Sequence, residues 1–398
     1  MFQKIFNPDE IPFGVFILKQ MINNEDIRYM RMALGQAACG VGKVNPNPLV
    51  GAVIVQNNTV IGSGYHKQFG GPHAEINAIR HANEDIKGAT MYVTLEPCSH
   101  YGKTPPCVDT LINAGFSRVV IAMQDPNPLV AGKGIEKLRK NGILAEVGLL
   151  EAEAMELNRI FIKYIKTGRP YLVLKSAMSL DGKIATVGGH SKWISCHESR
   201  QYVHTLRNEL KGIMVGVNTV IIDDPQLTTR LNNAKGRNPV RIVVDSKGRI
   251  PLTARILQDG ENNPVIIATT RQCPDVKCQQ LMNAGHKVLI LPDKDGLVDL
   301  NILMETLGKM EIDGILLEGG GTLNESALRA GIVDEVQFFI APMLIGGQKA
   351  ITPVEGCGFE SIDESIHLHD LKIKQIGCDI LVTGKTNHTL ILSDNNPL

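Results

Sequence analysis

The feature that most constrains the fold is a set of possible metal ligands that lie far apart in the sequence. His73, Cys98 and Cys107 offer one imidazole and two thiols. Three nitrogen or sulfur ligands with an open fourth position are typical of a catalytic zinc site, because the open position holds a water whose pKa the metal lowers. Glu75 lies two residues after the histidine and is free to carry protons. The chain must therefore fold so that these positions meet.

Helical and strand patterns alternate around these ligands. Strands are predicted at residues 49–55, 59–64, 90–95, 118–123 and 142–147, and helices at 24–34, from His73 onward, at 108–114 and at 151–166. Cys98 follows a strand, whereas His73 and Cys107 open helices, whose positive N-termini favour thiolate ligands. Asp125 and Asn127 follow the strand 118–123, so we expect them to line a pocket at the strand ends.

The glycine and proline of Thr167-Gly168-Arg169-Pro170 indicate a domain boundary. We place an N-terminal extension at 1–23, a first domain at 24–167, a second at 168–392 and a polar tail at 393–398. In the second domain, strands are predicted at 171–179, 213–217, 240–245, 265–269, 287–291, 314–317, 336–341 and 380–383, and helices at 198–210, 300–309 and 323–330. Such alternation predicts an α/β domain with a mostly parallel sheet.

A glycine-rich turn, Gly319-Gly320-Gly321-Thr322, lies between a predicted strand and a predicted helix. Glycines at this place let a phosphate approach backbone N–H groups at the helix N-terminus. The turn lacks the full Gly-x-Gly-x-x-Gly spacing of dinucleotide-binding folds. The turn therefore predicts a site for the phosphates of a dinucleotide, but it does not specify the dinucleotide.

Composition excludes some classes of protein. Basic and acidic residues balance at 41 each, and aromatic residues make up 5%, which argues against a nucleic-acid binder that needs a basic groove and stacking platforms. Eight scattered cysteines favour a reducing compartment, by default the cytoplasm. No apolar run approaches the roughly 20 residues of a membrane span, so we expect no membrane partner.

Several of these residues have a structural alternative. His66 and His100 could be ordinary core or surface histidines, and Asp223, before Asp224-Pro225, could start a turn. Arg207 and Arg230 could be solvated charges, and Trp193 could stack on a ring or pack in the core. The remaining cysteines are interpreted as ordinary thiols: Cys39, Cys196, Cys273, Cys278, Cys357 and Cys378.

Two other functions remain open at this point. The His-x-Glu and Pro-Cys pattern is the signature of zinc-dependent base deaminases, in which the glutamate is the proton shuttle. One alternative is therefore a deaminase acting on a nucleic-acid base, with the second half as an accessory binding domain. Another is a zinc-stabilised interaction protein, which a fourth protein ligand would indicate.

The motifs together resemble the bifunctional deaminase-reductase family of riboflavin biosynthesis. They are Asn45-Pro46-Asn47-Pro48-Leu49-Val50-Gly51, His73-Ala74-Glu75, Glu96-Pro97-Cys98 through Pro105-Pro106-Cys107, Lys175, Ser179-Leu180-Asp181-Gly182, Asp223-Asp224-Pro225 and Glu318-Gly319-Gly320-Gly321. The long interval between Cys98 and Cys107 matches this family and differs from nucleic-acid deaminases.

The resemblance implies a cytidine-deaminase-like three-layer α/β domain followed by a dihydrofolate-reductase-like α/β domain. The first, with one Zn²⁺ per chain and Glu75 as proton shuttle, would deaminate a diaminopyrimidine that carries a ribosylamino phosphate. The second would use NADPH to reduce the ribosyl group to ribityl. Residues implied for the first substrate are Asn47, His66, Ser99, His100, Lys103, Asp125 and Asn127.

The reductase site is likewise implied by resemblance. NADPH would contact Ala177, Trp193, Thr219, Asp223, Ser246, Gly320, Gly321, Thr322, Leu323, Asn324, Glu325 and Ser326, and the substrate would contact Lys175, Ser191, Arg207, Leu227, Arg230 and Glu318. Lys175 and Asp223 are the expected catalytic residues, and the two arginines suit a phosphate. We expect a homo-oligomer that binds small phosphorylated pyrimidines and no nucleic acid.

Overall fold

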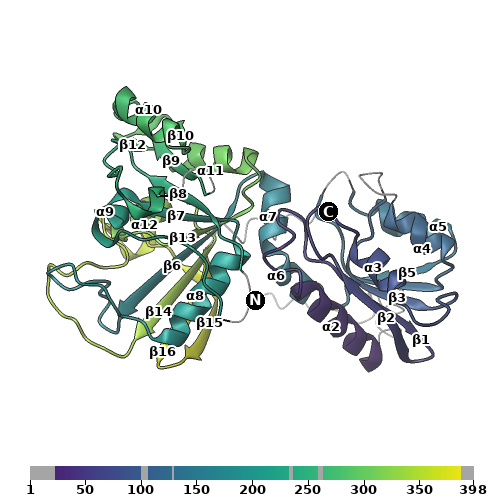
Figure 1. Cartoon of the computed structure of the whole chain (residues 1–398). Coiled ribbons are helices and arrows are strands. Elements are labelled where there is room, and N and C mark those ends of the chain that lie inside the picture. The colour runs from purple at the N-terminus through teal and green to yellow at the C-terminus, as the bar shows by residue number, and fades with distance from the viewer. Residues whose placement is uncertain (1–22, 100–105, 128–129, 233–235, 259–262, 387–398) are drawn as a thin grey trace, which may run out of the picture. The chain divides into compact units, whose positions relative to one another are not determined.

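The computed structural model describes residues 23–99, 106–127, 130–232, 236–258 and 263–386. The predicted extension before residue 23, the tail, His100 and Lys103 lie outside these ranges. Internal contacts divide the chain into a first unit that ends at Ile162 and a second that begins at Lys163 (Figure 1). The division falls inside helix α7 (Arg159–Thr167). Each unit has its own sheet and core.

The first unit is built on a five-stranded sheet in the order β2-β1-β3-β4-β5. Its strands are β1 (Gly51–Gln56), β2 (Thr59–Tyr65), β3 (Thr90–Leu95), β4 (Arg118–Met123) and β5 (Leu144–Val147). β1 pairs antiparallel with β2 and β3, whereas β3, β4 and β5 run parallel. Parallel strands carry their C-terminal ends to one edge, which positions the residues after β3 and β4 side by side.

Helices cover both faces of this sheet, because alternate residues of each strand point to opposite sides. Ile54 and Val93 pack with α3 (Ala74–Arg80), α4 (Cys107–Asn113) and α5 (Lys133–Lys140). Val53 and Tyr92 pack with α2 (Asn24–Ala38), α6 (Glu151–Leu157) and α7. A Cβ on Gly51 would lie 2.0 Å from the Ala33 carbonyl oxygen, so glycine lets α2 approach β1 this closely.

Some predicted helix boundaries in this unit differ from the structure. Asn23, rather than Asn24, caps α2 by accepting a hydrogen bond from the Asp26 N–H. The single helix predicted at 151–166 is two helices, α6 and α7, with a break at Asn158. The side-chain amide of Asn158 binds both the N–H and the carbonyl of Leu49, which fixes the chain at the break.

The second unit contains a nine-stranded sheet in the order β10-β9-β8-β7-β13-β6-β14-β16-β15. It comprises β6 (Tyr171–Ser179), β7 (Gly212–Gly216), β8 (Val240–Val244), β9 (Val265–Thr269), β10 (Lys287–Ile290), β13 (Gly314–Leu317), β14 (Glu335–Ala341), β15 (Leu368–Ile376) and β16 (Asp379–Thr386). The first seven strands in this order, ending with β14, run parallel to one another. β16 and β15 add an antiparallel edge. The predicted, mostly parallel sheet is therefore present.

Helices of the second unit follow the parallel strands. They are α8 (His197–Glu209), α9 (Val217–Asp223), α10 (Asp275–Asn283), α11 (Leu300–Lys309) and α12 (Gly321–Arg329), and the small hairpin β11 (Asp293–Lys294) with β12 (Leu297–Val298) precedes α11. Leu303 and Leu307 of α11 share one core with Leu172 of β6 and Ile315 of β13. Short 3₁₀ turns occur at Arg255–Leu257 and Ile362–Glu364.

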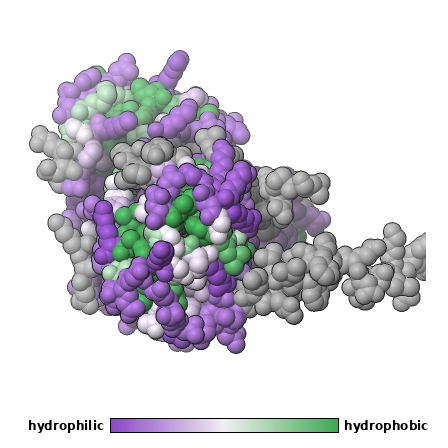
Figure 2. Space-filling model, turned by 90° about the vertical axis from the view of Figure 1, so that its right-hand side faces the viewer, coloured by the Kyte–Doolittle hydropathy of each residue, from purple (hydrophilic) through white to green (hydrophobic). Residues whose placement is uncertain are grey.

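Hydrophobic as well as hydrophilic residues reach the surface of the molecule. Figure 2 shows hydrophobic residues in the middle of the face in view and hydrophilic residues around them. Within the residues that the structure describes, no helix combines the length and apolar character needed to cross a bilayer.

Candidate functional site

The three predicted metal ligands lie together at one edge of the first sheet. His73 caps the N-terminus of α3, Cys98 follows β3, and Cys107 is the first residue of α4. His73 Nδ1 is 3.5 Å from Cys98 Sγ and 3.3 Å from Cys107 Sγ. Tetrahedral zinc, with bonds of about 2.1 Å to nitrogen and about 2.3 Å to sulfur, separates such atoms by about 3.6 Å. The donor set therefore fits zinc.

The pKa values of the Cys98 and Cys107 thiols also fit a cation bound between them. Hydrogen bonding from the Cys107 thiol and from His73 outweighs burial and lowers the pKa of Cys98 to about 4. The hydrogen bond to Cys98 and burial raise the pKa of Cys107. A bound metal would stabilise both groups as thiolates, because a thiol must lose its proton to bind zinc.

Glu75 lies beside the ligands and is 3% exposed. Burial raises the pKa of the Glu75 carboxyl group, which also hydrogen-bonds to the Cys107 side chain. A buried carboxyl with a raised pKa next to a metal position can both accept and donate a proton. This arrangement suits the proton-shuttle role that the sequence predicts.

Some of the residues predicted to hold the first substrate lie near this edge of the sheet. The His66 ring lies edge-on to His73, with centroids 5.7 Å apart, and His66 Nε2 is 3.2 Å from the Asn47 side-chain nitrogen. Ser99 directly follows Cys98. Asp125 accepts a hydrogen bond from the Asn127 N–H in the loop after β4. Their substrate contacts remain predictions, as do those of His100 and Lys103 outside the described ranges.

Glu96 is a site residue to which sequence reasoning assigned no role. It is 3% exposed, and its two carboxylate oxygens accept hydrogen bonds from four backbone N–H groups, those of Asp125, Gly132, Gly134 and Ile135. The side chain therefore ties the loop after β4 and the start of α5 to the strand end that carries Cys98. Only the position of Glu96 directly before Pro97-Cys98 could have indicated it.

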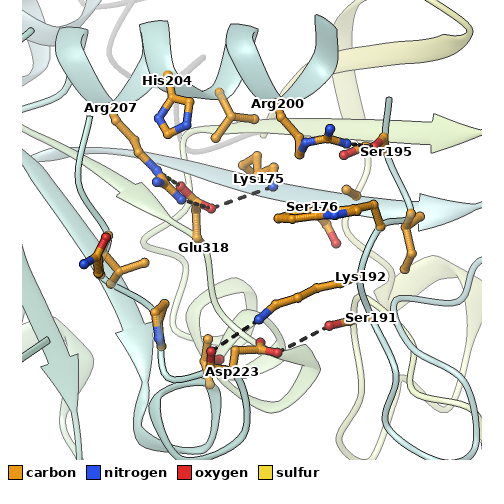
Figure 3. A pocket seen from close by; sticks show the side chains of 18 of the residues that line it. Lys175, Ser176, Ser191, Lys192, Ser195, Arg200, His204, Arg207, Asp223 and Glu318 are labelled. Carbon is orange, nitrogen blue, oxygen red and sulfur yellow. Dashed lines mark hydrogen bonds and ion pairs between the residues drawn. The ribbon is translucent and has the colours of Figure 1, made fainter. Parts of the chain in front are cut away.

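A cavity of about 620 Å³ in the second unit brings together most of the predicted reductase residues. Those that line it are Lys175, Ala177, Ser191, Trp193, Arg207, Thr219, Asp223, Leu227, Arg230 and Glu318. They come from β6, α8, α9 and the loops between strands (Figure 3). Ser191 Oγ donates to Asp223 Oδ1 over 3.3 Å.

Lys175, Arg207 and Glu318 form a partly buried charge cluster in this cavity (Figure 3). Arg207 Nε and Nη2 lie 2.7 and 3.0 Å from the two Glu318 oxygens, and Lys175 Nζ lies 3.8 Å from Oε2. Burial opposes ionisation of Glu318, but the two cations outweigh it and lower its pKa to about 2. Burial lowers the pKa of Lys175, against the opposing effect of Glu318.

Sequence reasoning missed other side chains of the same cavity, among them Ser176, Lys192, Arg200 and His204. Arg200, His204 and Arg207 are spaced i, i+4 and i+7 on α8, a polar stripe that could have been recognised. Burial and the charges of Arg207 and Arg230 lower the pKa of His204 to about 4. The neutral ring accepts a hydrogen bond from the Arg230 N–H.

A second cavity, of about 360 Å³, lies beside the first, since Thr219 lines both. Predicted cofactor residues in its wall are Ser246, Gly320, Thr322, Leu323 and Ser326. Lys247 and Arg249, not predicted as site residues, line it as well, and Arg249 binds the Asn218 side chain over 2.9 Å. Lysine and arginine in the wall of a cavity suit a phosphate group.

Three residues of the predicted cofactor set lie outside the walls of both cavities. The Gly321 carbonyl accepts from the Glu355 N–H, and Asn324 donates to the Pro353 carbonyl. Glu325 pairs with Arg329 over 2.7 Å. The bonds of Gly321 and Asn324 therefore hold α12 against the 352–356 segment, whereas the Glu325 pair lies within α12. Contact of these three residues with a cofactor remains a prediction.

Comparison with protein families assigns both units. Residues 23–123 match the family described as cytidine and deoxycytidylate deaminase zinc-binding region, and residues 170–382 match the RibD C-terminal domain. These matches confirm the predicted fold class, in which a cytidine-deaminase-like domain precedes a reductase domain. The zinc-binding description agrees with the ligand geometry.

Individual relatives cover nearly the whole chain. The riboflavin biosynthesis protein RibD of Actinobacillus pleuropneumoniae is 48% identical over 90% of this chain and 94% of its own, and that of Escherichia coli is 40% identical over 89% and 98%. The solved RibD of Acinetobacter baumannii is 39% identical, with a TM-score of 0.82 over 93% of this chain and 99% of its own.

A protein from Thermotoga maritima, solved as a diaminohydroxyphosphoribosylaminopyrimidine deaminase/5-amino-6-(5-phosphoribosylamino)uracil reductase, is 36% identical. Its TM-score is 0.79, over 91% of this chain and 99% of its own. The ligand geometry, both family matches and the length of these alignments lead to one assignment. This chain belongs to the RibD family of riboflavin biosynthesis proteins.

Proposed function

We propose that residues 24–167 remove an amino group hydrolytically from a diaminopyrimidine that carries a ribosylamino phosphate. Residues 168–392 then reduce the ribosyl group of the product to ribityl with NADPH. The observation that carries the deaminase assignment is the convergence of His73, Cys98 and Cys107 at zinc-like separations beside the buried Glu75. The titled activities of the Thermotoga maritima relative support the pairing of the two reactions.

In the deaminase, His73, Cys98 and Cys107 would hold zinc, which when bound supplies a Lewis acid that lowers the pKa of a water. Glu75 takes a proton from the attacking water. It then delivers protons to the ring and to the departing ammonia, for which its raised pKa is suited. Asn47, His66, Ser99, Asp125 and Asn127 orient the pyrimidine and its phosphate.

In the reductase, NADPH supplies the hydride. Residues of both cavities would hold it: Ala177, Trp193 and Asp223 of the larger cavity would contact the nicotinamide, and Gly320 and Thr322 of the smaller one would contact the phosphates. Lys175 places a proton-bearing ammonium at the ribosyl group, where its lowered pKa favours proton transfer. Glu318 keeps that ammonium in place, and Ser191 and Leu227 shape the pocket.

Phosphate binding in the reductase falls chiefly to Arg230. The Arg207 guanidinium is engaged by Glu318 and by the Thr228 carbonyl, over 3.0 Å. It therefore orients Glu318 and contributes positive charge. Arg230 lines the same cavity and is exposed, and it supplies a planar, permanently charged donor set that matches a phosphate.

We further propose that the chain works in the cytoplasm as a homo-oligomer. All eight cysteines are free thiols, which supports a reducing compartment. The edge strand β15 exposes Leu371 and Ile373, at 61% and 75%, and an exposed apolar edge strand is a surface that a second copy can cover.

The deciding experiment supplies the diaminopyrimidine ribosylamino phosphate to the full chain with and without NADPH, and identifies the products. Ammonia release should not need NADPH, whereas ribityl formation should. In Glu75→Gln, zinc content should be unchanged and ammonia release should fall by roughly 10² to 10⁴.

Two controls make the result specific. Glu153→Gln changes an exposed glutamate of α6 and should leave ammonia release unchanged. Glu75→Gln given the already deaminated compound should still oxidise NADPH. Ordinary ammonia release by Glu75→Gln with its zinc bound would contradict the assignment.

A further inference from the structure

A second cluster of metal-ligating side chains lies in the reductase unit. Among the described residues, two groups of three or more His, Cys, Asp or Glu place their ligand atoms within 4.8 Å of one another. One is His73, Cys98 and Cys107. The other is Cys196, Cys378 and Asp379, from the N-cap of α8 and the turn between β15 and β16.

The three ligand atoms lie close enough together to share a metal ion, all within 4.8 Å of one another. Cys378 Sγ lies 3.6 Å from Asp379 Oδ1, and tetrahedral zinc with bonds of about 2.3 Å to sulfur and about 2.0 Å to oxygen separates such atoms by about 3.5 Å. Asp379 is fully buried, and its Oδ2 accepts the Cys196 N–H over 2.8 Å. That contact keeps Oδ1 directed toward the thiols.

A further carboxylate lies beside Cys196, on α8. The Glu198 carboxylate hydrogen-bonds to Cys196. A Cβ on Gly377 would lie 2.8 Å from both Cys196 Sγ and a Glu198 oxygen. Gly377 has a φ of +58°, a conformation that glycine adopts without strain. The turn thus brings its backbone directly against the thiol and the carboxylate.

The donor types in this cluster suit a divalent cation. Two thiols and a buried carboxylate lie together, and thiolate and carboxylate groups are both zinc ligands. By contrast, the buried pair Cys273 and Cys278, with sulfurs 3.3 Å apart, belongs to neither three-ligand group.

We propose that Cys196, Cys378 and Asp379 bind a zinc ion in the reductase unit. Two thiolates and a carboxylate suit a borderline-soft divalent metal, with water in the fourth position. The ion joins the start of α8 to the β15–β16 turn. Sequence analysis interpreted Cys196 and Cys378 as ordinary thiols, because they lie too far apart in the chain to be read as a pair.

The position of the ion connects it to the reductase cavity. Cys196 directly follows Ser195, which lines that cavity and accepts a hydrogen bond from Arg200 over 2.5 Å. Arg200 lies over the Trp193 ring at 4.6 Å. A metal at Cys196 therefore fixes the end of the segment that carries Ser191 and Trp193, and stabilises the unit to the extent that zinc binds the native state alone.

The test measures zinc stoichiometry in the full chain. Protein stripped with a chelator under reducing conditions is titrated with Zn²⁺ against a chromophoric competitor. The unmodified chain should bind two ions per chain, one for each ligand group. Cys378→Ser and His73→Ala should each bind one, and the double variant none. Cys357→Ser, which changes another exposed thiol of the same unit, should still bind two.

Two readouts guard against misfolding and against the redox alternative. Cys378 is exposed, so its serine variant should fold, and ammonia release with zinc present should be unchanged. Asp379→Asn preserves the acceptor for the Cys196 N–H and should also lose the second ion. A stoichiometry of one in the unmodified chain would overturn the proposal. So would a Cys196–Cys378 disulfide found by mass spectrometry in protein isolated with reductant.

Discussion

Replacing Glu318 by glutamine tests the charge cluster of the reductase cavity. The Glu318 side chain is 12% exposed and pairs with Lys175 and Arg207, which are 15% and 12% exposed. Glutamine keeps the shape but removes the negative charge, so two partly buried cations remain close together. The pKa of Lys175, which burial already lowers, should fall further because Glu318 opposes that shift.

The magnitude follows from the burial of all three groups. Breaking a buried ion pair by removing one partner costs about 3 to 5 kcal/mol. For a unit of this size, each kcal/mol shifts the midpoint of thermal unfolding by about 2 to 4 °C. Glu318→Gln should therefore lower the unfolding midpoint of the second unit by roughly 6 to 20 °C.

Tryptophan fluorescence is the appropriate assay. Trp193 is the only tryptophan of the chain and lies in the second unit, so its signal reports the unfolding of that unit alone. The matched control is Glu305→Gln, which breaks the exposed pair with Arg169, 43% and 37% exposed. Exposed pairs contribute about 0 to 1 kcal/mol.

The unfolding temperatures of the two variants decide whether the charge cluster stabilises the second unit. If Glu318→Gln and Glu305→Gln unfold at the same temperature, the charge cluster does not stabilise the unit as argued. The double variant Glu318→Gln with Arg207→Met gives a further check. Removing both charged partners should recover part of the loss, because no unpaired Arg207 charge then remains.

Two further predictions concern residues that the structure alone identified. Glu96→Gln turns an amide NH₂ toward backbone N–H donors of the 125–135 segment. We expect the first unit to lose about 2 to 4 kcal/mol of stability and the KM for deamination to rise, with zinc content and NADPH oxidation unchanged. An unchanged KM would refute the positioning role. Lys247→Ala removes a cation from the 360 Å³ cavity. The KM for NADPH should rise roughly tenfold while the KM for NADH stays the same. Equal effects on both cofactors would place Lys247 away from the phosphate by which NADPH differs from NADH.

Strands were easier to predict than helices because their signal is local. The apolar runs at 90–95, 118–123, 265–269 and 314–317 coincide with β3, β4, β9 and β13. Helix α9, by contrast, contains Val217, Val220, Ile221 and Ile222, β-branched residues that favour a strand. Helix α5 offers only Ile135 and Leu138 to the core, which is too few to produce a recognisable period.

Site residues divide in a similar way. The metal ligands were predictable because each lies in a short motif at the end of an element, and only their distances needed the structure. Glu96 and the cluster of Cys196, Cys378 and Asp379 depend on long-range contacts such as the bond from the Cys196 N–H to Asp379. No pattern within a short window of sequence indicates them.

The division into two units, each with its own core and its own candidate site, has a consequence in genetic terms. A substitution at Glu75 and one at Lys175 affect different units, and the compound that links the two reactions is a small molecule. Two mutant copies of the gene, each defective in one unit, should therefore restore riboflavin synthesis when present together in one cell. The single reading frame would then behave as two complementation groups.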